Sequence, residues 1–271
     1  MSKYIQIEFQ NITSDQSDLL IAQLSEIGFS GFEEVEKSLK AFIPENDFIE
    51  AGVKEIAVNQ HISFQKSVIE ETNWNAVWES NFQPVVVDNF VGIRADFHEP
   101  IVGVEYEIVI TPKMSFGTGH HATTFMMIQQ MRGIDFNGKS VFDFGTGTGI
   151  LAILAEQSGA AKIVAVDYDE WSIENAEENL LRNNCLKFKL KKADHAESEE
   201  QFDIILANIN KNVILDNFSS LKKLLAKKGI LLLSGLLETD ESEIVTAGNN
   251  NSLIFEGKQV LNKWMALRFS H

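Results

Sequence analysis

The chain has 271 residues, of which 44% are hydrophobic, and a formal net charge of -16. This length and composition allow a packed core in one large domain or in two ordinary ones. The acidic balance argues against nucleic acid phosphates and anionic lipids as partners, and it suits a basic protein or a cationic cofactor. Cys185 is the only cysteine, so an intramolecular disulfide and a cysteine-cluster metal site are excluded.

The first seventy or so residues are predicted to form a small separate domain. Ser14 is expected to cap a helix that ends near Gly28. The further elements expected are a second helix at 47–57 and strands at 4–9, 31–35, 38–43 and 62–70. The order β-α-β-β-α-β is that of a ferredoxin-like module. We therefore assign residues 1–71 to an N-terminal α+β ferredoxin-like domain.

Residues 72–112 are expected to connect this domain to the rest of the chain. Trp74, Trp78 and Phe82 are four residues apart and would lie on one face of a helix. A linker helix packed against a neighbour is preferred to a nucleic-acid stacking platform, because the surroundings are acidic. Strands are expected near 85–97 and 104–111.

Residues 113–271 are predicted to form the larger domain, in which strands and helices alternate. The strands are expected at 139–145, 162–169, 187–194, 202–209 and 229–235, and the helices at 150–157, 171–182 and 213–226. This pattern predicts an α/β fold with a doubly wound parallel sheet. Two further strands in the tail, 252–271, make a seventh, antiparallel strand the expectation.

No segment indicates secretion or a membrane. The N-terminus has no apolar signal core, and the apolar runs "GILAILA" and "GILLLSGLL" are too short to cross a bilayer. We expect a cytoplasmic monomer.

The segment "VFDFGTGTGIL" ends a predicted strand, turns on Gly145, Gly147 and Gly149, and opens a helix. Such glycines let a ligand lie against bare backbone at the N-terminus of a helix. Asp167 ends the next strand, where a carboxylate can accept hydrogen bonds from both hydroxyls of a ribose. Asp169 is the better candidate for the cap of the following helix. These features predict a nucleotide-type cradle.

Two cofactors use this layout, and the spacing of the glycines favours one of them. The dinucleotide fingerprint is G-x-G-x-x-G, whereas the third glycine here comes one residue early, and Asp143 stands two residues before the first. The pattern D-x-G-x-G-x-G resembles motif I of S-adenosylmethionine-dependent methyltransferases. The resemblance places Asp143 near the methionine end of the cofactor and favours the methyl donor over NAD.

A second Phe-Gly-Thr-Gly lies upstream, in "SFGTGHHATT". It precedes a helix rather than a strand-initiated unit and lacks the ending of a phosphate loop, so a duplication is not favoured. Together with "FDFGTGTGILAI", "GAAKIVAVDYDEWSIENAEEN" and "ILANI", it resembles the methyltransferases of large-subunit ribosomal protein eleven over nearly all of residues 72–240. His120 and Ala122 depart from that pattern, in which Thr and Pro are usual.

The resemblance implies a single cofactor site that is formed by two separate stretches of the sequence. Phe116, Gly117 and Thr124 would close over S-adenosylmethionine from one side, and Gly145, Gly147 and Asp167 would hold it from the sheet. Asn208, at the end of the fourth strand, would lie beside the sulfonium and is the candidate catalytic residue, because its side-chain oxygen can accept a hydrogen bond from the substrate amine. Asn208 and Asp143 are also expected to contact the cofactor.

Three other polar residues lie near these motifs in the sequence. His120 and His121 are not expected to bind a metal, because adjacent side chains diverge and no acidic partner is near in sequence. His121 is expected to order its loop by hydrogen bonding. Asp194 either accepts from the adenine amino group or is a solvated acid.

The function implied is an N-methyltransferase for lysine or N-terminal amines of large-subunit ribosomal protein eleven. The N-terminal domain would recognise this basic protein, with no direct need for nucleic acid. Three alternatives stay open: a methyltransferase for another amine, a nicotinamide-dependent oxidoreductase, and a binding module that keeps the fold without catalysis.

Overall fold

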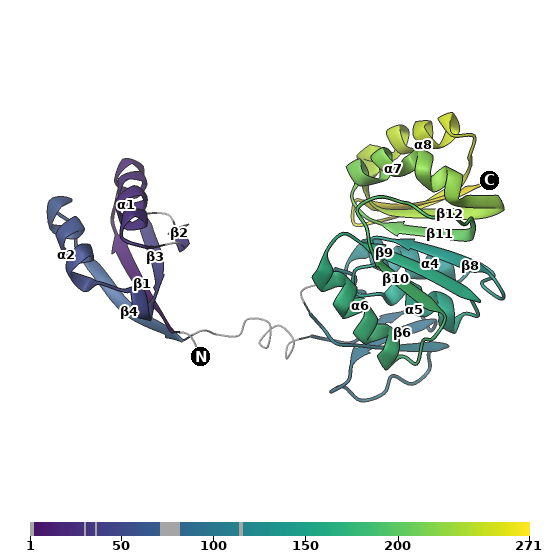
Figure 1. Ribbon diagram of the computed structural model, residues 1–271, viewed down its shortest axis with the longest axis horizontal. Coiled ribbons are helices and arrows are strands. Elements are labelled where there is room, and N and C mark those ends of the chain that lie inside the picture. Colours follow the sequence, from purple (N-terminus) through teal and green to yellow (C-terminus); the bar gives the residue numbers. More distant parts are fainter. Residues whose placement is uncertain (1–2, 30, 36, 71–81, 114–115) are drawn as a thin grey trace. The chain divides into compact units, whose positions relative to one another are not determined.

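The computed structural model describes residues 3–29, 31–35, 37–70, 82–113 and 116–271. The chain divides into two compact units, Met1–Val77 and Trp78–His271, which are described separately (Figure 1). The helix predicted around Trp74 and Trp78 lies outside the described residues. Phe82 is described, and its buried ring packs in the core of the second unit.

The first unit is an antiparallel sheet in the order β2-β3-β1-β4 with two helices packed against it. Its elements are β1 (Lys3–Gln10), α1 (Ser14–Glu26), β2 (Gly31–Val35), β3 (Ser38–Pro44), the short 3-10 helix η1 (Glu45–Asp47), α2 (Glu50–Asn59) and β4 (Phe64–Glu70). This is the predicted ferredoxin-like order. Alternate strand residues such as Ile5, Ile7 and Phe9 are buried beneath the helices.

The cap of α1 differs from the prediction by one residue. Thr13, not Ser14, is the N-cap: its hydroxyl accepts from the Gln16 backbone N–H at 3.3 Å. The Gln16 side chain in turn accepts from the Thr13 N–H at 3.0 Å. This reciprocal capping box requires a residue three positions before Gln16, which Ser14 is not.

The second unit is built on a seven-stranded sheet in the order β10-β9-β8-β11-β12-β14-β13. Its strands are β8 (Ser140–Phe144), β9 (Lys162–Asp167), β10 (Phe188–Lys192), β11 (Phe202–Asn208), β12 (Leu225–Leu237), β13 (Ile254–Leu261) and β14 (Trp264–Ser270). The first five are parallel, and β14 lies between β12 and β13, antiparallel to both. The predicted doubly wound seven-stranded sheet is thus confirmed.

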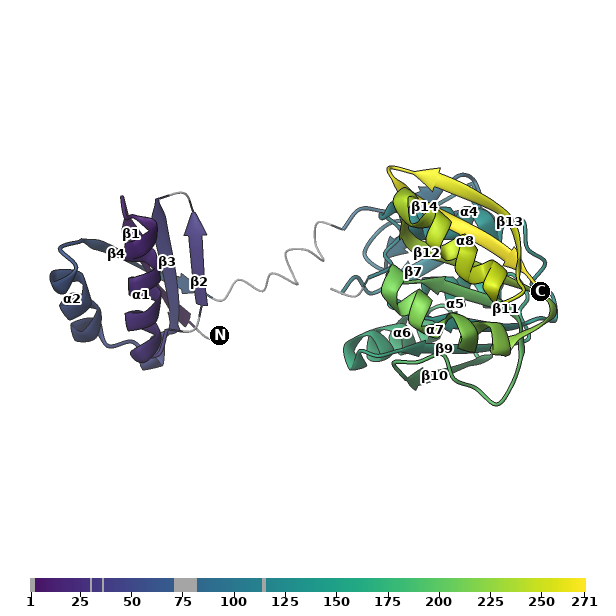
Figure 2. The same ribbon diagram turned by 90° about the horizontal axis from the view of Figure 1, so that it is seen from above.

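Helices cover both faces of this sheet (Figure 2). They are α4 (Ala122–Met131), α5 (Ile150–Gln157), α6 (Glu170–Arg182), α7 (Lys211–Leu224) and α8 (Glu241–Asn250), with the 3-10 helix η2 (Glu238–Asp240) before α8. Helix α8 was not predicted, because its sequence "ESEIVTAGNN" buries only Ile244 and Gly248 and so carries no apolar stripe.

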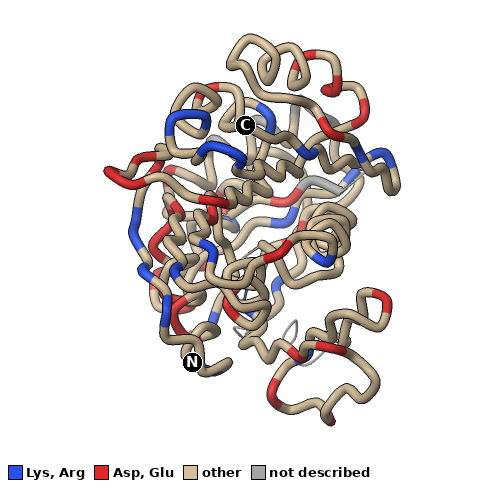
Figure 3. Tube along the Cα trace, turned by 90° about the vertical axis from the view of Figure 1, so that its right-hand side faces the viewer, with Lys and Arg blue, Asp and Glu red and all other residues tan. Residues whose placement is uncertain are grey.

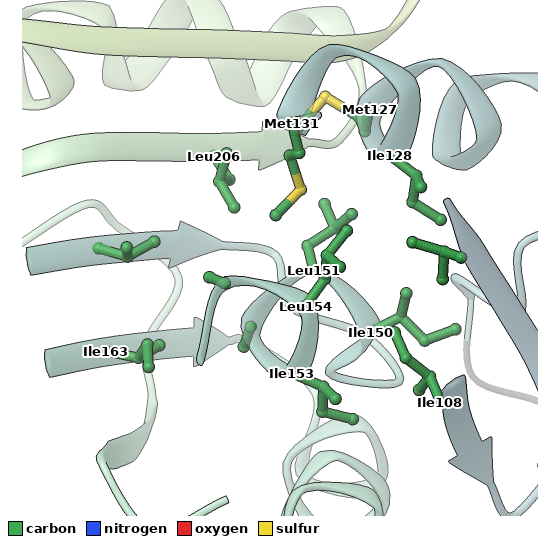
Figure 4. Close-up of a cluster of buried hydrophobic side chains, with 14 of the residues drawn as sticks. Ile108, Met127, Ile128, Met131, Ile150, Leu151, Ile153, Leu154, Ile163 and Leu206 are labelled. Atoms are coloured by element: carbon green, nitrogen blue, oxygen red, sulfur yellow. The ribbon is translucent and has the colours of Figure 1, made fainter. Parts of the chain in front are cut away.

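Successive residues of the central strands enter two different cores. Ile204 and Leu206 of β11 pack with α4 and α5 on one face, where Figure 4 shows Leu206. Ile205 and Ala207 pack with α7 on the other face. Such burial on both faces explains why these strands read as continuous apolar runs rather than as alternating ones. The same packing on both faces holds the carboxyl ends of β8, β9 and β11 in place relative to one another.

A smaller sheet, β5-β6-β7, is attached to α6 by asparagine side chains. It consists of β5 (Val85–Val87), β6 (Val91–Ala95) and β7 (Tyr106–Ile110). Asn183 donates to the Val109 carbonyl at 2.7 Å and accepts from its N–H at 2.9 Å. One turn earlier, Asn179 accepts from the Thr111 N–H at 2.8 Å. The asparagines therefore bond alternate residues, as a neighbouring strand would.

Charged residues of both signs are interspersed along the second unit (Figure 3). Several form ion pairs, among them Lys139–Asp203 at 3.6 Å and Lys211–Asp240 at 3.1 Å. In the first unit acidic residues outnumber basic ones. Within the described residues, no helix is both long and apolar enough to span a bilayer.

We expect Asn179→Ala to destabilise the second unit by roughly 2–4 kcal/mol, because it removes the partner of the part-buried Thr111 N–H and of the buried Thr148 carbonyl. Urea unfolding measures the change. Glu177→Ala, on the exposed face of the same helix, is the control and should shift the midpoint little. Equal midpoints for the two variants would show that these bonds contribute nothing net.

Candidate active site

A cavity of about 450 Å³ opens at the carboxyl ends of β8, β9 and β11. The order of the sheet reverses at β8, because β9 and β10 lie on one side of it and β11 and β12 on the other. Such switch points are the usual ligand sites of open α/β sheets. The lining residues are Phe116, His121, Thr123, Gly145, Gly147, Asp167, Tyr168, Asp169, Ser172, Asn208, Ile209, Asn210, Gly235 and Trp264.

The two Phe-Gly-Thr-Gly stretches meet at Thr148, which is fully buried. The Thr148 N–H donates to the Phe116 carbonyl at 3.0 Å, and its hydroxyl donates to the Gly117 carbonyl at 2.7 Å. Gly147 has φ +54°, and a Cβ there would stand 2.3 Å from the Phe116 oxygen. The glycine is therefore needed so that the upstream segment can lie directly on the turn.

Asp167 is held at the end of β9 with its carboxylate beside the glycine turn. Its Oδ2 accepts from the Gly147 N–H at 2.9 Å, and its Oδ1 accepts from the Asp169 N–H at 3.1 Å. The side chain is almost buried yet borders the cavity. Asp169 caps α6, as predicted, by accepting from the Trp171 N–H. Because Asp169 caps the helix, Asp167 is not needed for that role, and its carboxylate can accept hydrogen bonds from a ligand in the cavity.

Asn208 ends β11 on the other side of the cavity mouth. Its Nδ2 donates to the Thr124 hydroxyl at 3.1 Å. Its Oδ1 is buried and has no hydrogen-bond partner among the described residues. A buried amide oxygen without a partner is costly, so such an atom beside a cavity indicates a ligand that donates to it.

The remaining predicted residues fall into two groups. Phe116, with a half-exposed ring, and the turn glycines Gly145 and Gly147 line the cavity. Gly117 and Thr124 lie just behind the lining, where Gly117 accepts from Thr148 and Thr124 accepts from Asn208. Direct contact of these two with a cofactor stays a prediction.

Asp143 is completely enclosed behind the glycine turn. Its Oδ2 accepts from the Thr146 hydroxyl at 2.6 Å, and its Oδ1 has no partner among the described residues. Burial raises its pKa to about 7, and the Thr146 bond offsets this only in part; the nearby Asp167 charge raises it further. In this structure Asp143 shapes the turn, and its contact with the methionine end of a cofactor stays a prediction.

The two histidines have different partners. His121 is the N-cap of α4 and its Nδ1 accepts from the Thr123 N–H, so it orders the loop as predicted. His120 turns away: its Nδ1 is 3.2 Å from the Thr118 hydroxyl and its ring packs edge-on against Phe82. Asp194 lines an adjoining cavity of about 350 Å³ with Gly145 and Asp167. Among the described residues, no three potential metal ligands gather as a metal site requires.

Sequence reasoning missed seven residues of the cavity wall: Thr123, Tyr168, Ser172, Ile209, Asn210, Gly235 and Trp264. Tyr168 and Ser172 adjoin the predicted Asp167 and could have been included by position. Gly235 and Trp264 come from β12 and β14, and no motif marks them. The rings of Phe116, His121 and Trp264 follow one another along the wall, with centroids 5.3 and 4.7 Å apart.

Comparison with known proteins gives consistent matches over most of the chain. The family model described as ribosomal protein L11 methyltransferase (PrmA) matches residues 5–271. A relative of that name from Porphyromonas gingivalis is 36% identical over 261 residues, covering 93% of this chain and 90% of its own. Another from Chlorobaculum tepidum is 39% identical over 253 residues, covering 88% of this chain and 86% of its own.

A solved structure also matches. The crystal structure of the ribosomal protein L11 methylase from Lactobacillus delbrueckii subsp. bulgaricus has a TM-score of 0.65 and 28% sequence identity. It covers 70% of this chain and 99% of that chain. The likeness therefore extends from sequence to backbone.

The raised pKa of Asp143 predicts a pH-dependent stability. Because the folded chain holds this proton more tightly than the unfolded chain, the contribution of Asp143 to the free energy of unfolding falls as pH rises from about 4 to about 7, and stays lost above. We expect the uncharged Asp143→Asn to gain stability relative to the parent over that range, by up to about 4 kcal/mol. Thermal unfolding at several pH values measures this.

Asp203→Asn is the control with the opposite sign. Hydrogen bonds from Ser140 lower the pKa of Asp203, so its charge stabilises the fold at neutral pH and this stabilisation is lost on acidification. If the stabilities of Asp143→Asn and the parent change with pH in the same way, the claim that buried Asp143 binds a proton is wrong.

Proposed function

The chain belongs to the ribosomal protein L11 methyltransferase family, and from this premise we propose that it methylates lysine and N-terminal amines of ribosomal protein L11, protein eleven of the large subunit. It is a methyltransferase that uses S-adenosylmethionine. The observation that carries the proposal for the site is the buried Oδ1 of Asn208, which has no hydrogen-bond partner among the described residues and lies at the cavity that Asp167 borders.

The cavity offers groups that suit S-adenosylmethionine. Asp167 keeps lone pairs for ribose hydroxyls after accepting two backbone N–H groups. Gly145 and Gly147 present bare backbone, and the ring of Tyr168 stands largely exposed at the wall. Buried acid groups and the acidic chain suit a cationic sulfonium. We assign Asp167, Gly145, Gly147 and Phe116 to the cofactor.

The bound cofactor supplies an electrophilic methyl group on its sulfonium. The chain must then align an uncharged amine with that methyl group, and alignment is the main source of rate in such a displacement. Asn208 can accept an amine N–H through its Oδ1 while Thr124 holds its Nδ2 in place. The amine lone pair is thereby directed away from Asn208 and toward the methyl donor.

The protonation state of the amine is set by its surroundings. The cavity mouth is bordered by Ile209, Phe116 and Trp264, which are poor substitutes for water around an ammonium ion. Desolvation lowers the pKa of an amine that enters there, which favours the nucleophilic form. Asn208 accepts a hydrogen bond but cannot remove a proton, so its role is to orient the amine.

We further propose that residues 1–71 recognise the substrate and residues 113–271 bind the cofactor, with 72–112 connecting them. Every residue that lines the cavity comes from 116 onward. The first unit has its own core around Ile5, Ile7 and Leu20, and its excess of acidic residues suits a basic protein.

Two substitutions should separate cofactor binding from turnover. Asp167→Ala should weaken S-adenosylmethionine binding by roughly 10- to 100-fold, because it removes charge-assisted hydrogen bonds. Asn208→Ala should keep cofactor affinity within a few-fold and lower kcat instead, since its partner is the substrate amine. Calorimetry gives the affinity, and mass spectrometry of methylated L11 gives turnover and the modified residues. If Asn208→Ala keeps full turnover, Asn208 has no part in the reaction. If the chain methylates other amines but not L11, the proposed substrate is wrong.

The division of labour can be tested with a fragment of residues 72–271. Because the cavity and its supporting cores lie within the second unit, the fragment should fold and bind S-adenosylmethionine within a few-fold of the full chain. It should lose methylation of L11, measured beside the full chain. Undiminished methylation by the fragment would mean that the first unit only stabilises the enzyme.

A further inference from the structure

Strand β12 contains a bulge at the cavity. Leu233 pairs with Leu267 of β14, but the next pair is Leu236 with Met265, so β12 has one extra residue there. Gly235 lies in the bulge with φ +84°, a conformation that other residues rarely adopt. The Ser234 hydroxyl donates to the Met265 carbonyl at 2.9 Å, which ties the bulge to β14.

The bulge lies against the peptide that follows Asn208. The Ile209 N–H donates to the Ser234 carbonyl at 3.2 Å. A Cβ on Gly235 would stand 2.2 Å from the Ile209 oxygen, 2.7 Å from its carbonyl carbon and 2.9 Å from its nitrogen. All three are backbone atoms, so no rotation of a side chain could make room.

Ile209 is confined on its other side as well. A Cβ on Gly145, which has φ +77°, would stand 2.1 Å from the Ile209 Cγ2. The residue after Asn208 therefore fits between two glycines, one in the motif turn and one in β12. A side chain on either glycine would clash with Ile209.

The position of the Ile209 peptide bears on the orientation of the Asn208 side-chain amide. Thr124 holds the Nδ2 end, and the peptide after Asn208 is fixed by the bulge. We propose that Gly235 is a positioning residue. Because it leaves room for the Ile209 peptide, it aims the Asn208 Oδ1, which has no partner in the described part of the chain, at the substrate amine. This inference rests on the proposed amine-methylating function of the site. Gly235 borders the cavity, and in this role it acts through the Ile209 peptide and Asn208.

The test compares Gly235→Ala with Gly103→Ala. Gly103 has the same φ of +84°, but a Cβ there would meet no atom within 4 Å, so the two variants share the backbone strain and differ in the contact with Ile209. We expect Gly235→Ala to lower kcat on L11 about 100-fold, since a displacement near 1 Å can cost that much. The KM for L11 and the affinity for S-adenosylmethionine should change by less than about fivefold. Gly103→Ala should keep wild-type kinetics.

A second readout does not depend on activity. The side-chain NH₂ resonance of Asn208, identified by its loss in Asn208→Ala, should move in Gly235→Ala and stay in place in Gly103→Ala. Unchanged resonance together with wild-type kcat in Gly235→Ala would overturn the inference. A wild-type chain that fails to methylate L11 would sink the proposed function instead, and the resonance would still decide the role of Gly235.

Ser234→Ala covers the case in which Gly235→Ala does not fold. It removes the bond that ties the bulge to β14 and keeps the glycine and the packing. We expect roughly a tenfold loss of kcat with cofactor affinity retained, together with a shifted Asn208 resonance. Wild-type turnover and an unmoved resonance in this variant would also overturn the inference.

Discussion

Thr148 is the residue on which the site depends, because two separate segments bond to it and one of them links it to a third. Its N–H and hydroxyl hold the Phe116–Gly117 carbonyls, and its own carbonyl accepts from Asn179 of α6 at 2.9 Å. Asn179 in turn binds Thr111 beyond the end of β7. One buried threonine thus connects the upstream loop, the glycine turn and the small sheet. The bond from Asn179 to the Thr148 carbonyl is buried, so losing it would leave that carbonyl without a water to replace the partner.

Much of the fold could be predicted because the pattern of apolar residues matched the burial. The runs in β8, β9 and β11 are buried on both faces, so they were recognisable as central strands. Helix α8 was missed because only Ile244 and Gly248 face the core. The cap of α1 was placed one residue late because Ser14 and Thr13 are equally good cap residues, and only the position of Gln16 distinguishes them.

For the site, local motifs were informative and tertiary contacts were not. Asp167 and the turn glycines follow strand ends directly, and the structure brings both to the cavity, although their contacts with a cofactor stay predictions. Gly235 and Trp264 reach the same cavity through a bulge and an antiparallel strand, which leave no trace in neighbouring residues. His120 and His121 are adjacent in sequence and diverge in space. The sequence could indicate that His121 orders its loop by hydrogen bonding, but not that it caps α4. Sequence alone could not show that Thr124 reaches Asn208 instead of the cavity.

The asparagine side chains that bond to β7 affect how readily another protein chain can associate with that strand. Strand β7 lies at the border of its sheet, and such a strand would ordinarily offer unpaired N–H and C=O groups to any other extended chain. Asn183 occupies both groups of Val109, and Asn179 takes the N–H of Thr111. The helix thereby blocks strand addition from another molecule without supplying a strand. A chain that loses these amides would expose a template for aggregation even while its catalytic residues remained intact.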